Sequence, residues 1–171
     1  MLFRGVSDNH WPLKELSASF GEKDITEYVL QLPEFHTNND NVRFNLLPKP
    51  SPSRAPAKYI VLADIPATPI PQYTLKMIRQ AVENGAKLII LDGEFTLQKG
   101  EYAGTVLEEI LPVSVKDKWG EATPLPDAKI HKHNGKDSIV WKNVGKGTVY
   151  VVLGNIVKDP SVADVLKYYK F

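Results

Sequence analysis

Acidic side chains follow three apolar stretches of this 171-residue chain. Asp8 comes after the first stretch, Asp64 after the second, and Asp92 with Glu94 after the third. If these ends meet, they supply the oxygen ligands that Mg²⁺ or Ca²⁺ binds, and close like charges raise carboxyl pKa values toward those of a general base. Acids at strand exits also accept hydrogen bonds from backbone N–H groups and cap helices. The pattern therefore leaves two interpretations open, structural capping and a crevice for a ligand or metal.

Other polar residues accompany these acids. Asn9 and His10 directly follow Asp8, although His10 also precedes a tryptophan and a proline that suit a helix entry. Tyr102 lies in a loop between two glycines, where it either reaches the crevice or packs beneath the loop. No residue is assigned as catalytic or as a metal ligand, and no cofactor is expected. The candidate ligand-binding residues are Asp8, Asn9, His10, Asp64, Asp92, Gly93, Glu94 and Tyr102.

A histidine pair forms a second candidate site. His131 and His133 alternate with other residues, so on a strand they share one face with side chains roughly 7 Å apart. Such a pair can bind a transition metal, but neither an acid nor a cysteine lies nearby in the sequence. A hairpin that faces solvent is the simpler prediction.

Several kinds of chemistry are excluded by residues that the chain lacks. It has no cysteine, which removes disulfides, thiolate metal sites and thiol nucleophiles, and which fits a cytoplasmic location. It has no G-x-G-x-x-G or G-x-x-x-x-G-K-[ST] pattern to hold phosphates. The third strand exit reads LDGEF at 91–95 where a serine hydrolase would have G-x-S-x-G. The net charge of +1, without a clustered basic face, gives no reason to expect nucleic-acid binding.

The elements that must position these residues alternate between strand and helix. Residues 59–62 are a continuous apolar run and read as a buried strand, and 87–91, apolar from Leu88 onward, reads as the next one. Apolar spacing of three and four between them predicts a helix. Thr68 is the expected cap of this helix and Pro69 its first residue, with Gly85 at its end. A strand, a crossover helix and a second strand make a right-handed unit, which predicts a parallel sheet. The expected inward stripe is Ile70, Thr74, Met77, Ile78, Ala81 and Gly85.

The rest of the chain completes one domain over 1–171. Strands are predicted at 1–6 and 25–32, a helix at 11–20, and a proline-rich surface loop at 48–58. Residues 114–155 read as a mostly antiparallel extension, because strands at 129–133, 138–142 and 148–153 are joined by tight glycine turns. A final helix is expected to turn Val162, Val165, Leu166 and Tyr169 inward. The predicted fold class is α/β, a flavodoxin-like or Rossmann-like three-layer parallel sheet flanked by helices with a C-terminal antiparallel hairpin or meander.

Size and hydropathy place the chain among globular proteins. With 171 residues and 43% hydrophobic content it can bury one good core. No apolar run approaches the roughly 20 residues that a membrane-spanning helix needs. The first residues also lack the features of a signal peptide, so a cytoplasmic protein without a membrane segment is expected.

Two blocks of the sequence resemble a protein family. The segments VENGA at 82–86, YAGT at 102–105, LEEILPV at 107–113 and GKGTV at 145–149 are similar to a non-classical branch of the class I glutamine amidotransferase-like superfamily, and more distantly to trehalose-utilisation-type domains. In members that hydrolyse glutamine, a cysteine stands at the turn after the strand that matches 87–91. Here Gly93 and Glu94 occupy that turn, and a carboxylate is too weak a nucleophile to replace a thiolate.

The resemblance implies a catalytically inactive amidotransferase-like domain. Such a domain would serve as a protein-interaction module, with self-association as its simplest form, or as a module that binds a small polar ligand. The alternative is a metal-dependent or sugar-acting enzyme or sensor that uses Asp8, Asp64, Asp92 and Glu94. The two hypotheses differ in whether those acids must lie close together and exposed.

Overall fold

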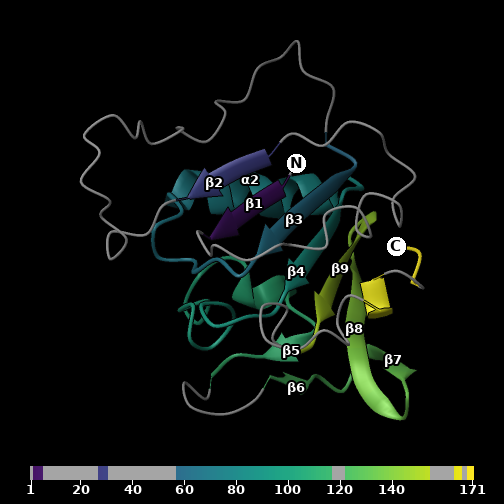
Figure 1. The fold of residues 1–171 in the computed structure, drawn as a ribbon. Helices are drawn as coiled ribbons and strands as arrows, with labels where there is room; N and C mark the ends of the chain where they lie inside the picture. The colour runs from purple at the N-terminus through teal and green to yellow at the C-terminus, as the bar shows by residue number, and fades with distance from the viewer. Residues whose placement is uncertain (1, 6–26, 31–56, 117–121, 155–163, 167–168) are drawn as a thin grey trace.

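A seven-stranded mixed sheet forms the centre of the structure (Figure 1). The computed structural model describes residues 2–5, 27–30, 57–116, 122–154, 164–166 and 169–171. The strands lie in the order β2-β1-β3-β4-β9-β8-β7, which makes this a mixed α/β fold. Their bounds are β1 (Leu2–Gly5), β2 (Glu27–Leu30), β3 (Tyr59–Ala63), β4 (Lys87–Leu91), β7 (Lys129–His133), β8 (Lys136–Val144) and β9 (Gly147–Val152).

The first part of the sheet is parallel, as the sequence predicts. β1 pairs in parallel with β2 and β3, and β3 pairs in parallel with β4. The register sets Ala63 opposite Leu91, so β3 and β4 end side by side. The residues that follow these two strands therefore lie at the same edge of the sheet.

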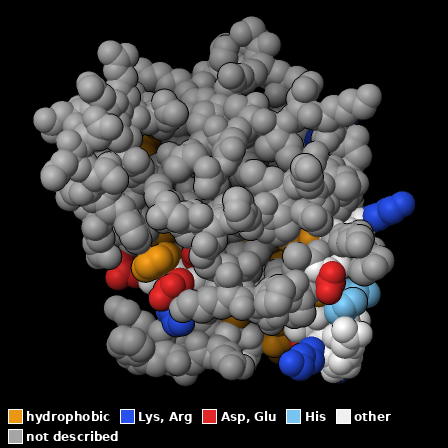
Figure 2. All heavy atoms as spheres, viewed as in Figure 1, with side chains coloured by type: hydrophobic (Ala, Val, Ile, Leu, Met, Phe, Trp, Pro, Cys, Tyr) orange, Lys and Arg blue, Asp and Glu red, His pale blue; other side chains and the backbone are white. Residues whose placement is uncertain are grey.

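The C-terminal strands extend this sheet through an antiparallel meander. β7 pairs antiparallel with β8, and β8 pairs antiparallel with β9. β9 also pairs in parallel with β4, with Leu91 opposite Val152. The predicted meander is confirmed, but its last strand belongs to the parallel part as well. Histidine and lysine side chains lie on the surface over the β7–β8 hairpin, at the right of Figure 2, in keeping with the exposed side chains of β7.

Two hydrophobic clusters cover the two faces of the sheet. Ile60 and Leu62 of β3 point to one face, and Val61 and Ala63 point to the other, as strand alternation requires. The first cluster includes the buried residues of helix α2 (Gln72–Glu83), and the second includes Val165 and Leu166 of the helical segment at 164–166. Each face therefore buries apolar side chains against a different part of the chain.

Helix α2 begins later than the sequence predicts. Its N-cap is Pro71, and Thr68 lies in a preceding turn in which the Ile70 N–H donates to the Ala67 carbonyl oxygen. The Thr68 hydroxyl donates a hydrogen bond to Glu101 in the loop after β4, so Thr68 does not cap α2. The buried face of α2 consists of Thr74, Leu75, Ile78 and Val82, of which the predicted stripe contained the first and third.

Several expected elements fall outside the described residues, namely the helix at 11–20, most of the loop at 48–58 and the start of the final helix. Three short segments add structure that was not predicted. β5 (Val113–Ser114) and β6 (Thr123–Pro124) pair antiparallel, and η2 (Glu108–Ile110) is a single 3₁₀ turn. No helix in the described ranges combines the length and the apolar content that crossing a membrane requires.

Candidate functional site

The structure brings two of the predicted acids together at the ends of β3 and β4. The Asp64 N–H donates to the Leu91 carbonyl oxygen at 3.1 Å, and the Asp92 N–H donates to the Val152 carbonyl oxygen at 3.1 Å. Asp64 therefore extends the pairing of β3 with β4 by one residue, and Asp92 does the same for the pairing of β4 with β9. Glu94 follows in the loop with an exposed side chain, whereas Asp8, Asn9 and His10 lie outside the described residues.

Asp64 is held as a turn residue. It is 3% exposed and has a left-handed backbone with φ of 44°. Its Oδ1 atom accepts hydrogen bonds from the Phe95 N–H at 2.7 Å and the Thr96 hydroxyl at 3.5 Å. A Cβ atom on Gly93 would lie 2.2 Å from the same Oδ1 atom, so only glycine fits there. The carboxylate of Asp64 thus ties the turn after β3 to the loop after β4.

Burial changes the acidity of both aspartates. Burial raises the pKa of Asp64 above its usual value, and the backbone N–H groups of Phe95 and Glu94 oppose that rise. The pKa of Asp92 is raised to about 6, chiefly by burial, with the charge of Asp64 adding to the rise and a hydrogen bond from the Gly93 N–H opposing it. Asp92 therefore exchanges its proton close to neutral pH.

Tyr102 belongs to the packing around these acids. Its side chain is fully buried, and its hydroxyl donates to the Ile65 carbonyl oxygen at 2.8 Å. Burial raises the pKa of the Tyr102 phenol, and the charges of Asp64 and Asp92 raise it further, so the hydroxyl remains protonated. Tyr102 thereby joins the loop after β4 to the turn after β3, which is the packing role that the sequence left open.

The histidine pair lies far along the sheet from these strand ends, on β7. The His131 ring lies 5.0 Å from the Tyr169 ring, measured between centroids, and His131 is exposed. Within the described ranges, no three His, Asp or Glu side chains are grouped so that they could hold a metal ion.

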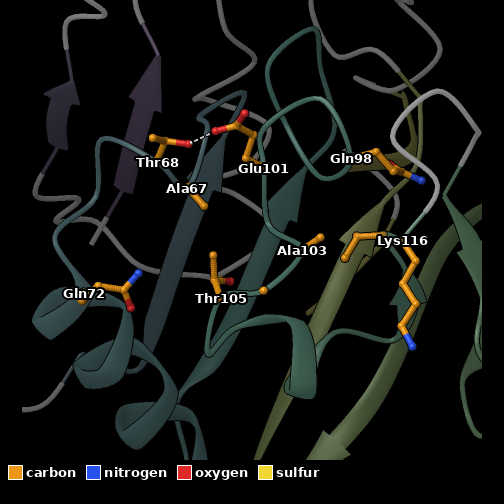
Figure 3. Close-up of a pocket in the computed structure, with 10 residues that line it drawn as sticks. Ala67, Thr68, Gln72, Gln98, Glu101, Ala103, Thr105 and Lys116 are labelled. Carbon is orange, nitrogen blue, oxygen red and sulfur yellow. Dashed lines mark hydrogen bonds between the residues drawn. The ribbon is translucent and has the colours of Figure 1, made fainter.

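A pocket of about 480 Å³ lies among the loops beyond the acids (Figure 3). The turn after β3, the start of α2, the loop after β4 and the end of β5 each contribute to its wall. Its lining residues are Ala67, Thr68, Gln72, Gln98, Glu101, Ala103, Gly104, Thr105, Val115 and Lys116.

Hydrogen bonds between the two loops shape this pocket. The Ala67 N–H donates to the Gly100 carbonyl oxygen at 2.7 Å, and the Thr68 hydroxyl donates to Glu101 Oε2 at the rim. Glu101 has a left-handed φ of 57°, a conformation that non-glycine residues rarely adopt. Buried and backbone groups therefore join the loops that form the wall of the pocket.

The polar groups of the pocket differ from those at the strand ends in their exposure. Thr68, Gln72, Glu101 and Lys116 are exposed. Gln98 is buried and donates from Nε2 to the Ser114 carbonyl oxygen at 3.4 Å. Sequence reasoning named none of the ten lining residues as site residues. The available signal was that the loops after two strands predicted to run in parallel meet at the same edge of the sheet.

Comparisons with known proteins give fold similarity alone. No protein-family model matches the chain, and no curated protein sequence does. The cytoplasmic protein STM1381 from Salmonella typhimurium LT2 is similar in structure, with a TM-score of 0.64 and 16% identity over 98% of this chain and 92% of its own. The cytoplasmic protein STM3548 from Salmonella typhimurium has a TM-score of 0.55 and 15% identity over 98% of both chains. The chain therefore shares a mixed α/β fold with these proteins.

Proposed function

We propose that this chain is a catalytically inactive amidotransferase-like domain that binds a small polar ligand in the pocket beyond β3 and β4. The proposal includes a flavodoxin-like three-layer fold, because the strand order β2-β1-β3-β4-β9 follows the 2-1-3-4-5 order of that class. It also includes a cytoplasmic location, in keeping with a chain that contains no cysteine.

The residues of the turn after β4 argue against glutaminase activity. A thiolate nucleophile would have to stand in the turn that follows β4, and the sequence has no cysteine there or elsewhere. Gly93 in this turn packs against the Asp64 carboxylate, which leaves no room for a side chain. The turn therefore serves to connect two loops.

The pocket between these loops is the observation that carries the proposal. Its volume of about 480 Å³ lies within the range of roughly 300 to 1,000 Å³ that is usual for small-molecule sites. It also lies outside the carboxyl ends of parallel strands, where open α/β sheets bind their ligands. Exposed side chains with hydroxyl, amide, carboxylate and ammonium groups line it, which favours a polar ligand.

A thermal-shift screen with sugars, amino acids, organic acids and nucleotides tests this proposal. A ligand at 100 times its Kd stabilises the folded state by about 2.7 kcal/mol, which raises the Tm of a chain of this size by roughly 5 to 10 °C. The variant Ala103→Trp places a large side chain in the pocket wall and should abolish the shift. The matched control Lys146→Trp lies in the β8–β9 turn, at the opposite edge of the sheet, and should retain it.

Two outcomes would overturn the proposal. If no compound shifts the Tm, the protein-interaction role takes its place, with self-association to be measured by light scattering. If Ala103→Trp binds as well as the parent, the ligand lies elsewhere.

The alternative function uses the acidic strand ends. The observation that favours it is the pKa of about 6 for Asp92 beside Asp64, which suits proton transfer to or from a sugar or a metal-bound water. Binding that Asp92→Asn abolishes and Ala103→Trp leaves intact would select this function.

A further inference from the structure

Strand β7 lies at one end of the strand order and forms an edge of the sheet. In the described part of the chain its only strand neighbour is β8, and Figure 1 shows β7 at the end of the row of strands. An edge strand keeps one row of backbone N–H and C=O groups that the sheet does not use. An extended peptide can pair with such a row and add a strand to the sheet.

The β-bulge next to this edge lies in β8 and leaves β7 regular. The pairs on the two sides of the bulge are His131–Ile139 and Lys132–Asp137, which leaves Ser138 as an additional residue in β8. A bulge bends the strand that carries the additional residue, and no residue is inserted into β7. The outer edge of β7 is therefore uninterrupted over the length of the strand.

The two faces of β7 carry different side chains. Lys129, His131 and His133 alternate along one face, where the Lys129 ammonium lies 4.5 Å from the centroid of the Trp141 ring. Ile130 lies on the opposite face and is 43% exposed. A strand added to this edge would therefore meet basic side chains on one face and an apolar side chain on the other.

The charge of this edge is positive. Lys129 and Lys132 lie on β7, and Lys136 begins β8. Among the described residues only Lys132 of these three has an acidic partner, Asp137 at 3.3 Å. The aromatic ring beneath Lys129 does not neutralise its charge. Lysine and histidine side chains accordingly lie on the surface over this hairpin in Figure 2.

These charges disfavour the pairing of β7 with a second copy of itself. In an antiparallel pair about a two-fold axis, the basic side chains of one copy would lie opposite those of the other, and like charges in that position are destabilising. An acidic strand would meet the same side chains with opposite charge. Its acidic residues must occupy every second position, with apolar residues between them on the face of Ile130.

We propose that β7 binds an acidic, extended peptide segment of a partner protein as an added edge strand. Backbone pairing supplies affinity, and the alternating acidic and apolar side chains supply selectivity. This interaction goes beyond the proposed function, because it uses the edge strand and not the pocket.

Titration calorimetry on the full chain at low ionic strength tests the proposal with capped synthetic peptides. The acidic peptide is GEVEVEG, and its neutral and basic counterparts are GQVQVQG and GKVKVKG. The neutral peptide should bind about tenfold more weakly than the acidic one, and the basic peptide should bind more weakly still. Added salt should weaken the acidic peptide, because the charges that attract it are exposed.

The variant Lys129→Glu tests the position of the peptide by reversing one charge. It should weaken GEVEVEG by about tenfold and bind GKVKVKG more tightly than the parent does. The matched control Lys146→Glu, in the β8–β9 turn, should bind the peptides as the parent does. Circular dichroism of both variants should match the parent, since both lysines are exposed.

N-methylated peptides separate backbone pairing from simple charge attraction. Alternate N–H groups of a strand point to the same edge, so methyl groups on the valine nitrogens block one edge of GEVEVEG and methyl groups on the glutamate nitrogens block the other. One of these two peptides should lose at least about tenfold in affinity relative to the other. Amide hydrogen exchange of the complex should show new protection within 129–133.

Three results would overturn the proposal. If both methylated peptides bind as tightly as GEVEVEG and an oligonucleotide displaces it, the hairpin is a general site for polyanions. If millimolar GEVEVEG protects other amides, or none, the peptide does not pair with β7. If 129–133 become protected at high protein concentration without peptide, the occupant of the edge is a second copy of the chain.

Discussion

Two neighbouring groups of polar residues at one edge of the sheet are used in opposite ways. Asp64 and Asp92, directly at the ends of β3 and β4, hold the surrounding loop through backbone hydrogen bonds. Thr68 and Glu101, farther along the two loops, and Lys116, after β5, are exposed around a pocket. Asp64 and Asp92, which the sequence suggests as site residues, thus form hydrogen bonds that hold the loop in place.

The difference follows from distance along the chain. A residue directly after a buried strand is still covered by neighbouring strands, so its polar groups must find partners within the protein. Residues several positions later have left the sheet and can face solvent. Polar residues at the strand ends therefore stabilise the loops, and polar residues in the outer parts of the loops can contact a ligand.

The largest predicted effect is on stability, at Gly93 beside the strand ends. Gly93→Ala would place a Cβ atom 2.2 Å from Asp64 Oδ1 and 2.7 Å from Asp64 Cβ. Such overpacking should lower the free energy of unfolding by about 2 to 3 kcal/mol, measured by urea denaturation. The comparison variant Gly104→Ala, on the pocket wall, has no atom within 4 Å of the new Cβ and should lose only about 1 kcal/mol, from its left-handed φ of 75°.

A double mutant identifies the cause of the Gly93→Ala effect. Glycine tolerates the φ of 44° at position 64, so Asp64→Gly removes the clashing side chain without new backbone strain. The two changes combined should cost less than the sum of the single changes, by more than about 1 kcal/mol. If the losses in the free energy of unfolding simply added, a clash with the Asp64 side chain would not be the cause of the Gly93→Ala effect.

The next effect is the pH dependence that Asp92 adds to stability. Its pKa is raised from 3.8 to about 6 in the folded protein, so the folded state binds this proton more tightly than the unfolded state does. The stability that the proton contributes is fully present below about pH 3.8 and is lost as the pH rises through 6. Asp92→Asn should therefore become more stable relative to the parent as the pH rises from 4 to 7, by about 1 to 2 kcal/mol after allowance for partial solvent exposure.

Chemical denaturation of both proteins at several pH values measures this difference, because the other titrating groups contribute to both. A difference that stays constant from pH 4 to 7 would mean that Asp92 is solvated like an ordinary surface acid. In that case the strand ends would be as open as the pocket.

The parallel strands were predictable because their signal is local and strong. Residues 88–91 form a continuous apolar run, and β4 occupies the predicted strand 87–91. The burial of Val165 and Leu166 likewise follows from helical spacing. Glycine turns predicted the antiparallel pairing of β7, β8 and β9.

Long-range contacts limited the other predictions. Thr68 looks like a helix cap in sequence, but its hydroxyl bonds to Glu101, which is 33 residues away. The parallel pairing of β9 with β4 depends on where the meander returns to the sheet, which local spacing does not encode. The pocket depends on four segments that come together only in the folded chain.

The smallest predicted effect is at the pocket rim. Two hydrogen bonds join the same pair of loops, one from the exposed Thr68 hydroxyl to Glu101 and one from the buried Tyr102 hydroxyl to the Ile65 carbonyl oxygen. Tyr102→Phe leaves a buried carbonyl oxygen without its donor and should lower the free energy of unfolding by about 1 to 2 kcal/mol. Thr68→Val removes a solvated bond and should change the same quantity by less than about 0.5 kcal/mol in urea denaturation. If both variants lost the same free energy of unfolding, the Thr68 hydrogen bond at the pocket rim would stabilise the fold as much as the buried Tyr102 bond does. The strand ends and the pocket rim would then not differ in their structural role.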